Sequence, residues 1–336
     1  MKNSLNLNNG IKPLFIFSLP RSGSTLLQRI LGSDEKIATT SEPWILLPYI
    51  YTLKSRGVYT AYWHKRSVMA IEDFCKELPN GQDDYLEEIQ QLILRLYSKV
   101  AVNNQKSDAK YFLDKTPRYS IIAEDIIKLF PQAKFIFLWR QPLAVVSSIL
   151  ETWTQSTWNL YEWKIDLFEG LLNLLTTYQK YANQSYALCY ENLLASPEQE
   201  CQNLFNYLEL PFNPEIVYSF NKLKLQGKMG DPTGIKEYTT INSSSLDKWK
   251  LSVVNPVRKL WYRRYLYWIG EENLSFMGYD FDELLQELNS IPVGIKNIYS
   301  DVSRMSYGLL YCALEPQSIK NKFKSFSNWS SIYPHM

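Results

Sequence analysis

Six residues near the N-terminus have side chains and spacing suited to binding an anion: residues 20–25 read Pro-Arg-Ser-Gly-Ser-Thr. An apolar run at residues 14–17 precedes them, and apolar residues at helical spacing follow between positions 26 and 31. A strand, a tight loop and a helix in this order point backbone N–H groups at a bound anion. The hydroxyls add hydrogen-bond donors, and Arg21 adds a fixed positive fork. The sequence therefore predicts a phosphate-type binding loop.

This loop differs from the nucleoside-triphosphate loop, whose pattern is G-x-x-x-x-G-K-[ST]. Residues 20–25 contain one glycine, no lysine precedes Ser24 or Thr25, and the charge comes earlier, from Arg21. The alternative interpretation is a strand, turn and helix with ordinary Ser or Thr capping.

A second arginine and a second hydroxyl follow a later apolar stretch, residues 134–140. Arg140 ends this stretch, and Ser148 lies eight residues on, about two turns into a helix expected to begin at Pro142. A guanidinium fork and a hydroxyl in this arrangement can hold a second phosphate. The alternatives are a salt bridge from Arg140 to a carboxylate and a Ser148 hydroxyl bonded to its own helix backbone.

Composition indicates a globular chain without a general affinity for polyanions. The 336 residues are 46% hydrophobic and 21% charged with a net charge of +2, so we expect no nucleic-acid partner. Four widely spaced cysteines and two histidines lack metal-ligand spacing, so we expect neither a disulfide framework nor a metal site. The polar N-terminus lacks the apolar core of a signal peptide, and no apolar window is long enough to span a membrane. We therefore expect a cytoplasmic location.

Apolar stretches alternate with amphipathic ones, which predicts an α/β fold with three layers and a mostly parallel central sheet flanked by helices. Further strands are expected at residues 37–44, 110–117, 134–140 and 186–193. Helices are expected at residues 83–102 with Asp83 or Asp84 as the cap, 120–130, 142–153, 160–182, and from a capping box at 196–199. Ligands of such sheets bind beyond the carboxyl ends of the strands, so Arg21, Lys115 and Arg140 can converge on one crevice.

Four further segments lie outside this pattern of strands and helices or have an unusual composition. Residues 45–66 are aromatic and irregular, which suits a lid, an acceptor-site wall or a helical surface layer. Residues 221–242 are expected to form a long loop. Residues 257–269 mix basic and aromatic side chains, and either a membrane surface or a solvated basic face explains this pattern. Residues 291–336 are expected to be a C-terminal extension.

The two phosphate motifs together resemble those of the sulfotransferase family, whose donor is 3′-phosphoadenosine 5′-phosphosulfate (PAPS), over roughly residues 13–285. Residues 114–117, 190–197 and 245–249 also look like the family's. The resemblance implies a P-loop-nucleotide-hydrolase-like sulfotransferase domain at residues 13–290 after a tail at residues 1–12. It implies these cofactor-binding residues: Arg21, Ser22, Gly23, Ser24, Thr25, Arg140, Ser148, Tyr190 and Lys248.

The resemblance also implies a catalytic base. One branch of the family uses His on the turn after the second strand, where this chain has Pro117. The branch that sulfates protein tyrosines uses Glu 21 residues after the loop Arg, and Glu42 has that spacing from Arg21. We assign the base role to Glu42 and stabilisation of the leaving group to Arg21 and Lys115. The alternatives for Glu42 are an exposed carboxylate or a salt-bridge partner of Arg21.

We therefore expect a sulfotransferase that moves a sulfonate group from PAPS to an acceptor hydroxyl on a carbohydrate, glycolipid or small metabolite, with PAP as product and no metal. The tyrosine-sulfating branch has an Arg two residues after its Glu, and Trp44 stands there in this chain. Together with the expected cytoplasmic location, this departure argues against sulfation of secreted protein tyrosines. Peripheral membrane contact is compatible with the sequence, and the oligomeric state is open. The alternatives are a nucleotide-dependent kinase on a related fold and a non-catalytic nucleotide-binding protein.

Overall fold

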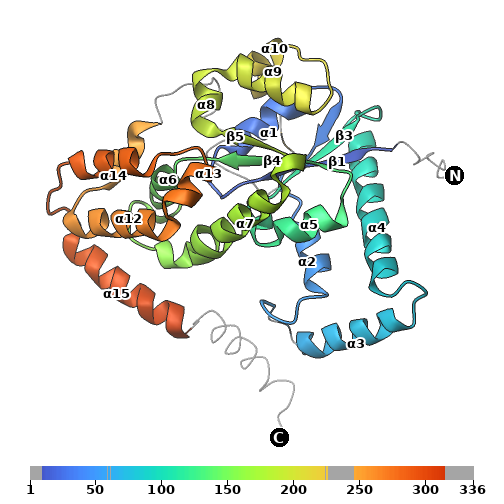
Figure 1. Ribbon diagram of the computed structural model, residues 1–336, viewed down its shortest axis with the longest axis horizontal. Helices are drawn as coiled ribbons and strands as arrows, with labels where there is room; N and C mark the ends of the chain where they lie inside the picture. The colour runs from blue at the N-terminus through green and yellow to red at the C-terminus, as the bar shows by residue number, and fades with distance from the viewer. Residues whose placement is uncertain (1–9, 59, 61, 224, 226–245, 315–336) are drawn as a thin grey trace, which may run out of the picture.

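The central element is a parallel β-sheet with the strand order β2-β3-β1-β4-β5. The computed structural model describes residues 10–58, 60, 62–223, 225 and 246–314 (Figure 1). The strands are β1 (Lys12–Phe17), β2 (Ile37–Thr39), β3 (Tyr111–Lys115), β4 (Lys134–Trp139) and β5 (Ser185–Cys189). From β1 the chain first adds β3 and β2 on one side of the sheet and then crosses over to add β4 and β5 on the other side. The direction of connection therefore changes at β1, the strand that the loop at residues 20–25 follows. This is the position at which such sheets bind ligands.

The strands read as unbroken apolar runs because both faces of the sheet are buried. Successive residues of β1 alternate between the faces: Leu14 and Ile16 join one core cluster, and Phe15 and Phe17 join the other. The rings of Phe15 and Phe135 on adjacent strands lie stacked with centroids 6.0 Å apart. Burying an aromatic or branched side chain of this kind contributes about 1.5–3 kcal/mol.

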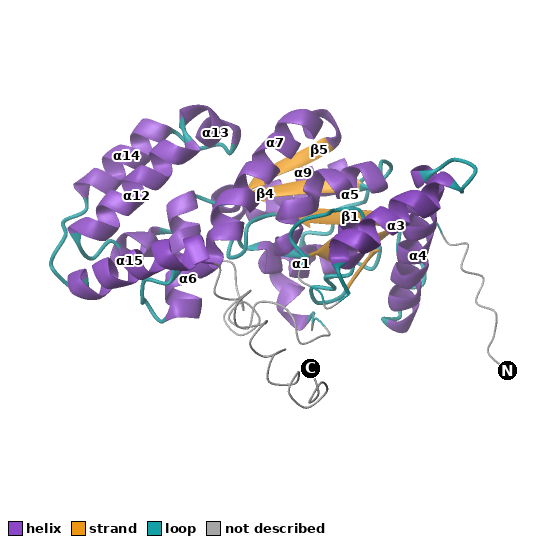
Figure 2. Ribbon diagram, turned by 90° about the horizontal axis from the view of Figure 1, so that it is seen from below, coloured by secondary structure: helices purple, strands orange, loops and turns teal. Residues whose placement is uncertain are grey.

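Helices cover both faces of the sheet (Figures 1 and 2). Helices α1, α8, α9 and α10 pack on the face of Leu14, and α4, α5, α6, α7 and α12 pack on the face of Phe15. The three-layer α/β arrangement expected from the sequence is confirmed. The helices are α1 (Ser24–Gly32), α2 (Leu46–Tyr51), α3 (His64–Lys76), α4 (Gln82–Asn103), α5 (Ala123–Leu129), α6 (Pro142–Thr154), α7 (Leu171–Tyr181), α8 (Tyr190–Ala195), α9 (Pro197–Tyr207), α10 (Glu215–Ser219), α12 (Pro256–Ile269), α13 (Glu271–Phe276), α14 (Phe281–Ser290) and α15 (Ile298–Leu314).

Short non-α helical turns connect these elements. They are η1 (Pro117–Ile122), η2 (Leu160–Trp163), η3 (Ile165–Gly170), η4 (Ala182–Gln184), η5 (Phe220–Lys222) and η6 (Asp247–Ser252). The segment at residues 160–182, expected to be one helix, is therefore divided, and η3 is a π-type turn. A Cβ atom on Gly170 would lie 2.6 Å from the Ser120 hydroxyl, so η3 and η1 approach closely only because a glycine stands there.

The expected helix caps differ from the observed ones. Helix α4 begins after Gly81 without a side-chain cap, and Asp84 instead accepts hydrogen bonds from the backbone and side chain of Asn80. Ser196 occupies the N-cap position of α9, but its hydroxyl does not cap the helix. Pro197 does stand at the first position of α9, as expected.

The C-terminal helix is joined to the rest by a buried ion pair. The guanidinium of Arg258 on α12 donates from Nε to Asp301 Oδ2 at 2.7 Å and from an Nη atom to Oδ1 at 2.9 Å. Asn255 caps α12 and donates a further hydrogen bond to the same carboxylate. Of the region expected to be an extension, α15 thus packs on α12, and residues 315–336 lie outside the described residues. So does most of the predicted loop at residues 221–242.

No helix in the described ranges combines the length and the apolar character that crossing a bilayer requires.

Candidate active site at the carboxyl ends of the strands

Each of the five strands delivers one candidate side chain to the same edge of the sheet. Arg21 follows β1, Glu42 follows β2, Lys115 ends β3, Arg140 follows β4 and Tyr190 follows β5. The convergence expected for Arg21, Lys115 and Arg140 is therefore present. Contacts between these side chains define the site.

The loop at residues 20–25 turns sharply between β1 and α1. Gly23 has φ 84°, and a Cβ atom there would lie 2.3 Å from the ring of Tyr190. Both the backbone angle and the close ring require glycine. Arg21 also has a positive φ, 66°, which is a strained conformation for a residue with a side chain. No side chain caps α1, so the hydroxyls of Ser24 and Thr25 do not serve as ordinary caps.

Arg140, which follows β4, contacts Arg21 on this loop, so the two arginines expected to bind phosphates lie close together. Arg140 donates a 2.7 Å hydrogen bond to the backbone carbonyl of Arg21, and its guanidinium lies 4.7 Å from the centre of the Tyr190 ring. Arg21 Nε donates to the Ser148 hydroxyl at 3.1 Å. Arg140 Nε is buried and has no hydrogen-bond partner among the described residues. A buried guanidinium N–H without an acceptor marks a place where an anionic oxygen would be stabilised.

On the other side of the loop, Lys115 and Glu42 form a buried ion pair. The distance from Lys115 Nζ to Glu42 Oε1 is 2.8 Å, and the side chains are 1% and 11% exposed. Lys115 also donates to the Thr25 hydroxyl at 3.3 Å, which joins the pair to the anion-binding loop. Glu42 is therefore neither a solvated carboxylate nor bonded to Arg21 by any contact that the structure gives. Its second oxygen accepts a 3.2 Å hydrogen bond from the indole of Trp44.

A buried hydrogen-bond network, which the sequence did not reveal, holds the segment that carries Glu42. Asp114 Oδ2 accepts from Tyr97 at 2.6 Å and from Tyr119 at 3.1 Å. The Tyr119 hydroxyl accepts from the Leu46 backbone. The Thr116 hydroxyl donates to Asp114 Oδ1 and accepts from the backbone of Trp44, whose φ is 56°. The backbone N–H groups of Trp44 and Leu46, both on the segment that carries Glu42, thereby donate to side chains that follow β3 or lie in η1.

Burial raises the pKa of Asp114 to about 7, although hydrogen bonds from Tyr97, Tyr119 and Thr116 and the nearby Lys115 charge oppose the shift. The cause is desolvation of the carboxylate, which disfavours its charged form. A signal was present in the sequence, because an aspartate inside an apolar strand requires partners. The partners themselves, Tyr97 on α4 and Tyr119 in η1, could not be identified from the sequence around Asp114, because they depend on how these elements pack against β3.

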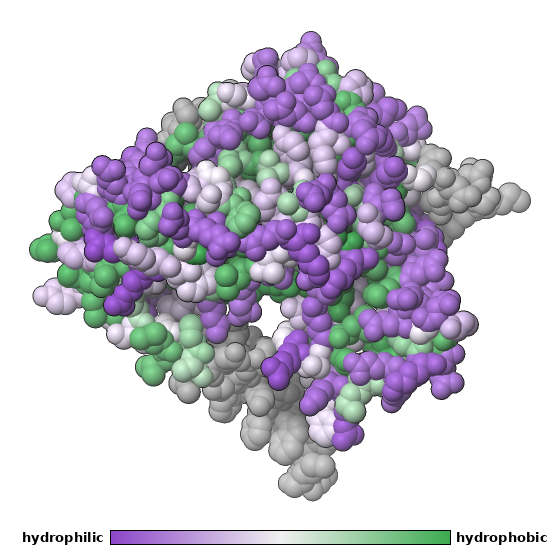
Figure 3. Space-filling view, viewed as in Figure 1, coloured by the Kyte–Doolittle hydropathy of each residue, from purple (hydrophilic) through white to green (hydrophobic). Residues whose placement is uncertain are grey.

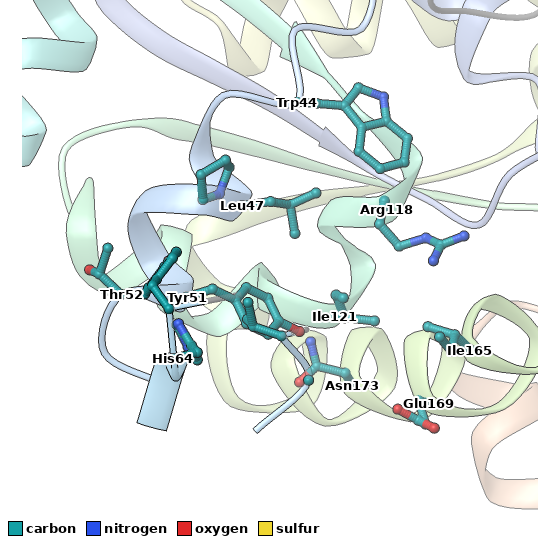
Figure 4. A pocket seen from close by; sticks show the side chains of 14 residues that line it. Trp44, Leu47, Tyr51, Thr52, His64, Arg118, Ile121, Ile165, Glu169 and Asn173 are labelled. Atoms are coloured by element: carbon teal, nitrogen blue, oxygen red, sulfur yellow. The ribbon is translucent and has the colours of Figure 1, made fainter. Parts of the chain in front are cut away.

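A cavity of about 800 Å³ adjoins the Glu42 segment (Figure 4). Its wall is largely apolar and aromatic, and includes Trp44, Leu47 and Tyr51. Of its charged residues, Arg118 is paired with the buried Asp166 at 2.9 Å. Glu169 and Asn173 line the opposite side. Described residues of the aromatic segment at residues 45–66, among them Leu47, Tyr51 and Tyr62, thus form one wall of a cavity beside the candidate base.

The remaining predicted residues differ in their placement. Tyr190 is buried, packs against Gly23 and lies beneath Arg140. Lys248 is exposed on η6, which packs against α6. Ser22, Ser24 and Thr25 are buried within the turn. Trp153, which the sequence did not single out, lies on α6 with its ring 5.6 Å from the Arg21 guanidinium.

Comparison with known proteins gives the family. The profile of the sulfotransferase family matches residues 13–214, and the chain belongs to this family. It is 28% identical over 153 residues to nodulation protein NoeE of Sinorhizobium fredii (strain NBRC 101917 / NGR234), covering 44% of this chain and 34% of that protein. It is 25% identical to protein-tyrosine sulfotransferase 1 of Danio rerio, covering 72% of this chain and 66% of the relative.

The matched region is only part of some relatives. The chain spans about a third of NoeE and 30% of an uncharacterized protein of Aquifex aeolicus. Among solved structures, it is similar to the sulfotransferase domain from the curacin biosynthetic pathway, with a TM-score of 0.49 and 22% identity, covering 71% of this chain and 90% of that one. The family assignment rests on the sequence match.

The raised pKa of Asp114 predicts a specific dependence of stability on pH. Between about pH 4 and 7 the folded protein retains a proton that the unfolded chain has released, so the free energy of unfolding falls as pH rises through this range. Asp114→Asn keeps an acceptor for the tyrosines and should remove this component of the slope. Urea unfolding at a series of pH values measures it. The exposed Asp83→Asn variant is the control, and an unchanged slope in Asp114→Asn would contradict the assignment.

Proposed function

We propose that this chain transfers the sulfonate group of PAPS to an acceptor hydroxyl and releases 3′-phosphoadenosine 5′-phosphate (PAP). The observation that supports this proposal best is the meeting of Arg21, Arg140 and Ser148 around a glycine turn at the switch point of the sheet. Membership of the sulfotransferase family agrees with it. The buried Arg140 Nε, which has no hydrogen-bond partner among the described residues, suits a phosphate-bearing nucleotide.

The nucleotide would be held at two places. The 5′-phosphosulfate would lie on the loop at residues 20–25, where the backbone N–H groups and the hydroxyls of Ser24 and Thr25 donate hydrogen bonds. The 3′-phosphate would accept from Arg140 and Ser148. Because Arg140 already binds the carbonyl of Arg21, occupation of one phosphate position would stabilise the loop that forms the other. Tyr190 and Lys248 remain candidates for contact with the nucleotide.

Glu42 would act as the base. Its carboxylate takes the proton of the acceptor hydroxyl while the acceptor oxygen forms its bond to sulfur. The bond between sulfur and the bridging oxygen breaks, and that oxygen leaves with the 5′-phosphate. Lys115 and Trp44 hold the two oxygens of Glu42 and so fix its orientation.

Lys115 would link proton transfer to departure of the nucleotide. Before reaction its ammonium group is balanced by Glu42 at 2.8 Å. When Glu42 accepts the proton, it loses its negative charge, and the buried ammonium becomes uncompensated. The ammonium group of Lys115, together with the guanidinium of Arg21, would then stabilise the negative charge that develops on the bridging oxygen. In an in-line transfer, Glu42 would therefore act on the acceptor oxygen and Lys115 on the leaving oxygen.

The acceptor would carry its hydroxyl on an uncharged, ring-bearing or apolar body, as in a glycolipid or a small aromatic metabolite. The apolar wall of the cavity beside Trp44 supports this, because such surfaces bind ligands by burying apolar area. Arg118 is already paired with Asp166, and Glu169 adds negative charge to the lining. Acidic peptides would therefore be poor acceptors. The name of one relative, omega-hydroxy-beta-dihydromenaquinone-9 sulfotransferase Stf3, agrees with a lipid-like alcohol.

The two-phosphate arrangement predicts nucleotide selectivity. The wild-type protein should bind PAP more tightly than adenosine 5′-monophosphate or ATP with Mg²⁺. Arg140→Ala should weaken PAP binding by about 10- to 100-fold more than 5′-monophosphate binding, because only PAP loses the charged hydrogen bond to its 3′-phosphate while both nucleotides share the loss of the bond from Arg140 to the Arg21 carbonyl. Isothermal titration calorimetry measures both affinities, with the exposed Arg95→Ala as the control. Preference of the wild type for ATP would instead favour a kinase, and equal losses for both nucleotides would refute the 3′-phosphate role.

The base assignment predicts a separation of binding from catalysis. Glu42→Gln keeps an oxygen for Lys115 but cannot accept the proton, so sulfonate transfer should fall by about 10²- to 10⁴-fold while PAP affinity stays within about twofold. Radiolabelled sulfonate transfer and PAP titration measure the two effects, and the exposed Glu72→Gln variant is the control. Loss of PAP binding would mean that Glu42 is structural. Full transfer activity would indicate another base.

The cavity predicts acceptor preference. Wild-type protein should sulfate a neutral aryl alcohol such as 2-naphthalenemethanol with a higher kcat/KM than glucose or an acidic tyrosine peptide. Leu47→Asn should lower kcat/KM for the aryl alcohol by about 10-fold or more without weakening PAP binding. Leu172→Asn, on the exposed face of α7, is the matched control. A preference for glucose or the peptide, or equal effects of the two variants, would show that the cavity does not select the acceptor.

A further inference from the structure

Three buried polar side chains join the end of β3 to the segment that carries Glu42. Asp114, Thr116 and Tyr119 are each 0% exposed. Figure 3 shows many hydrophilic side chains on the surface, where water can bond them, whereas these three depend on partners inside the protein. A buried polar network is costly unless every member is satisfied. The partners of its hydrogen bonds therefore show what the network holds in place.

Two hydroxyls link Asp114 to the backbone of this segment, and each of them both accepts and donates. The Thr116 hydroxyl accepts from the Trp44 backbone N–H at 3.4 Å and donates to Asp114 Oδ1 at 3.2 Å. The Tyr119 hydroxyl accepts from the Leu46 backbone N–H at 3.2 Å and donates to Asp114 Oδ2 at 3.1 Å. A hydroxyl has one proton, so donating it to Asp114 leaves its lone pairs for the backbone N–H. Asp114 thereby orients both acceptors.

A third hydroxyl bonds the same carboxylate from a different element. Tyr97 on α4 donates to Asp114 Oδ2 at 2.6 Å, and its ring stacks on Phe112 with centroids 4.2 Å apart. The contacts of the described residues link Tyr97 to Asp114 but not to the segment that carries Glu42. Two phenols therefore donate to one oxygen, and of these Tyr119 alone also bonds that segment.

The backbone between Trp44 and Glu42 has little freedom to absorb a displacement. Pro43 separates them, its ring fixes its own φ, and the residue before a proline is restricted as well. Trp44 has φ 56°, and its indole donates to Glu42 Oε2 at 3.2 Å. A shift of the Trp44 backbone would therefore move the indole and the carboxylate together.

We propose that Thr116 and Tyr119 are positioning residues for the base Glu42. They act through the backbone N–H groups of Trp44 and Leu46, and the inference rests on the base role proposed above and deepens it. Loss of either hydroxyl leaves a backbone N–H without its acceptor, so the segment settles where the carboxylate reaches the acceptor hydroxyl less well. Such errors are costly, because a misplacement of about 1 Å can lower a rate by about 100-fold.

The charge of Asp114 sets how well this network is ordered. An ionised carboxylate accepts from all three hydroxyls, whereas a protonated one carries a proton of its own, so one hydroxyl must turn its proton elsewhere. The titratable groups around Asp114 are Tyr97 on α4, Tyr119 in η1 and Lys115 on its own strand. Burial raises the pKa of both tyrosines well above its ordinary value, so they remain donors. Because the pKa of Asp114 is raised to about 7, kcat should rise through this pH, and Asp114→Asn should lack that rise.

Transfer kinetics at saturating PAPS, together with PAP titration, test the proposal. Tyr119→Phe and Thr116→Val should each lower kcat by about 10-fold or more while PAP affinity stays within about twofold. Tyr97→Phe is the matched control, because it removes a phenol from the same carboxylate oxygen, and its kcat should stay within about threefold of the wild-type value. Thr116→Ser keeps the hydroxyl and should restore kcat. Circular dichroism and thermal melting check that each variant is folded.

Double variants with Glu42→Gln separate positioning from a merely structural role. Adding Tyr119→Phe or Thr116→Val to Glu42→Gln should lower transfer by less than about twofold further, because the group that they position is already gone. A full repeat of the loss in that background would overturn the proposal. So would wild-type kcat in both hydroxyl variants, or a rise of kcat near pH 7 that persists in Asp114→Asn. Full activity of Glu42→Gln alone would instead refute the base itself, so the two failures are distinguishable.

Discussion

The buried ion pair between Lys115 and Glu42 is the interaction on which the site depends. The ammonium group of Lys115 is 1% exposed, and removing one member of a buried ion pair typically costs about 3–5 kcal/mol. Lys115 stands at the end of β3, Glu42 follows β2, and Thr25, which also bonds Lys115, begins α1. One side chain therefore fixes the relative positions of three elements. The hydrogen bond from Trp44 to the second oxygen of Glu42 fixes the remaining freedom of the carboxylate.

Two residues beside this pair have strained backbone conformations. Arg21 and Trp44 both have positive φ angles, which cost of order 1–3 kcal/mol for residues with side chains. Arg21 is held by Arg140 through its carbonyl and by Ser148 through its guanidinium. Trp44 is held by Thr116 through its backbone. Preorganised donors of this kind need no rearrangement when charge develops, which is the condition for electrostatic catalysis.

The sequence predicted the elements that depend on local pattern. Apolar runs located the strands because both sheet faces are buried, and residues 20–25 were recognisable because a turn of this type needs Gly at one position and donors around it. Arg140 could be placed at the sheet edge because it directly follows an apolar strand. The side-chain caps expected at Asp83 or Asp84 and at Ser196 were wrong, since Asp84 found local partners at Asn80 and α9 starts without a side-chain cap. The division of residues 160–182 accompanies a close approach of Gly170 to Ser120, which are far apart in the sequence. The tyrosines that bind Asp114 could not be predicted, because their positions depend on how α4 and η1 pack against β3.

The connection between Arg258 and Asp301 constrains how this protein can vary. Both guanidinium donors that face α15 end on one carboxylate, and Asn255 binds that carboxylate as well. A shorter chain without Asp301 would leave the buried guanidinium of Arg258 on α12 without its carboxylate partner. The ring of Trp158 lies 5.4 Å from this guanidinium. In this protein α15 and Arg258 are therefore coupled, and α15 could be lost without stranding a buried charge only if Arg258 were replaced at the same time.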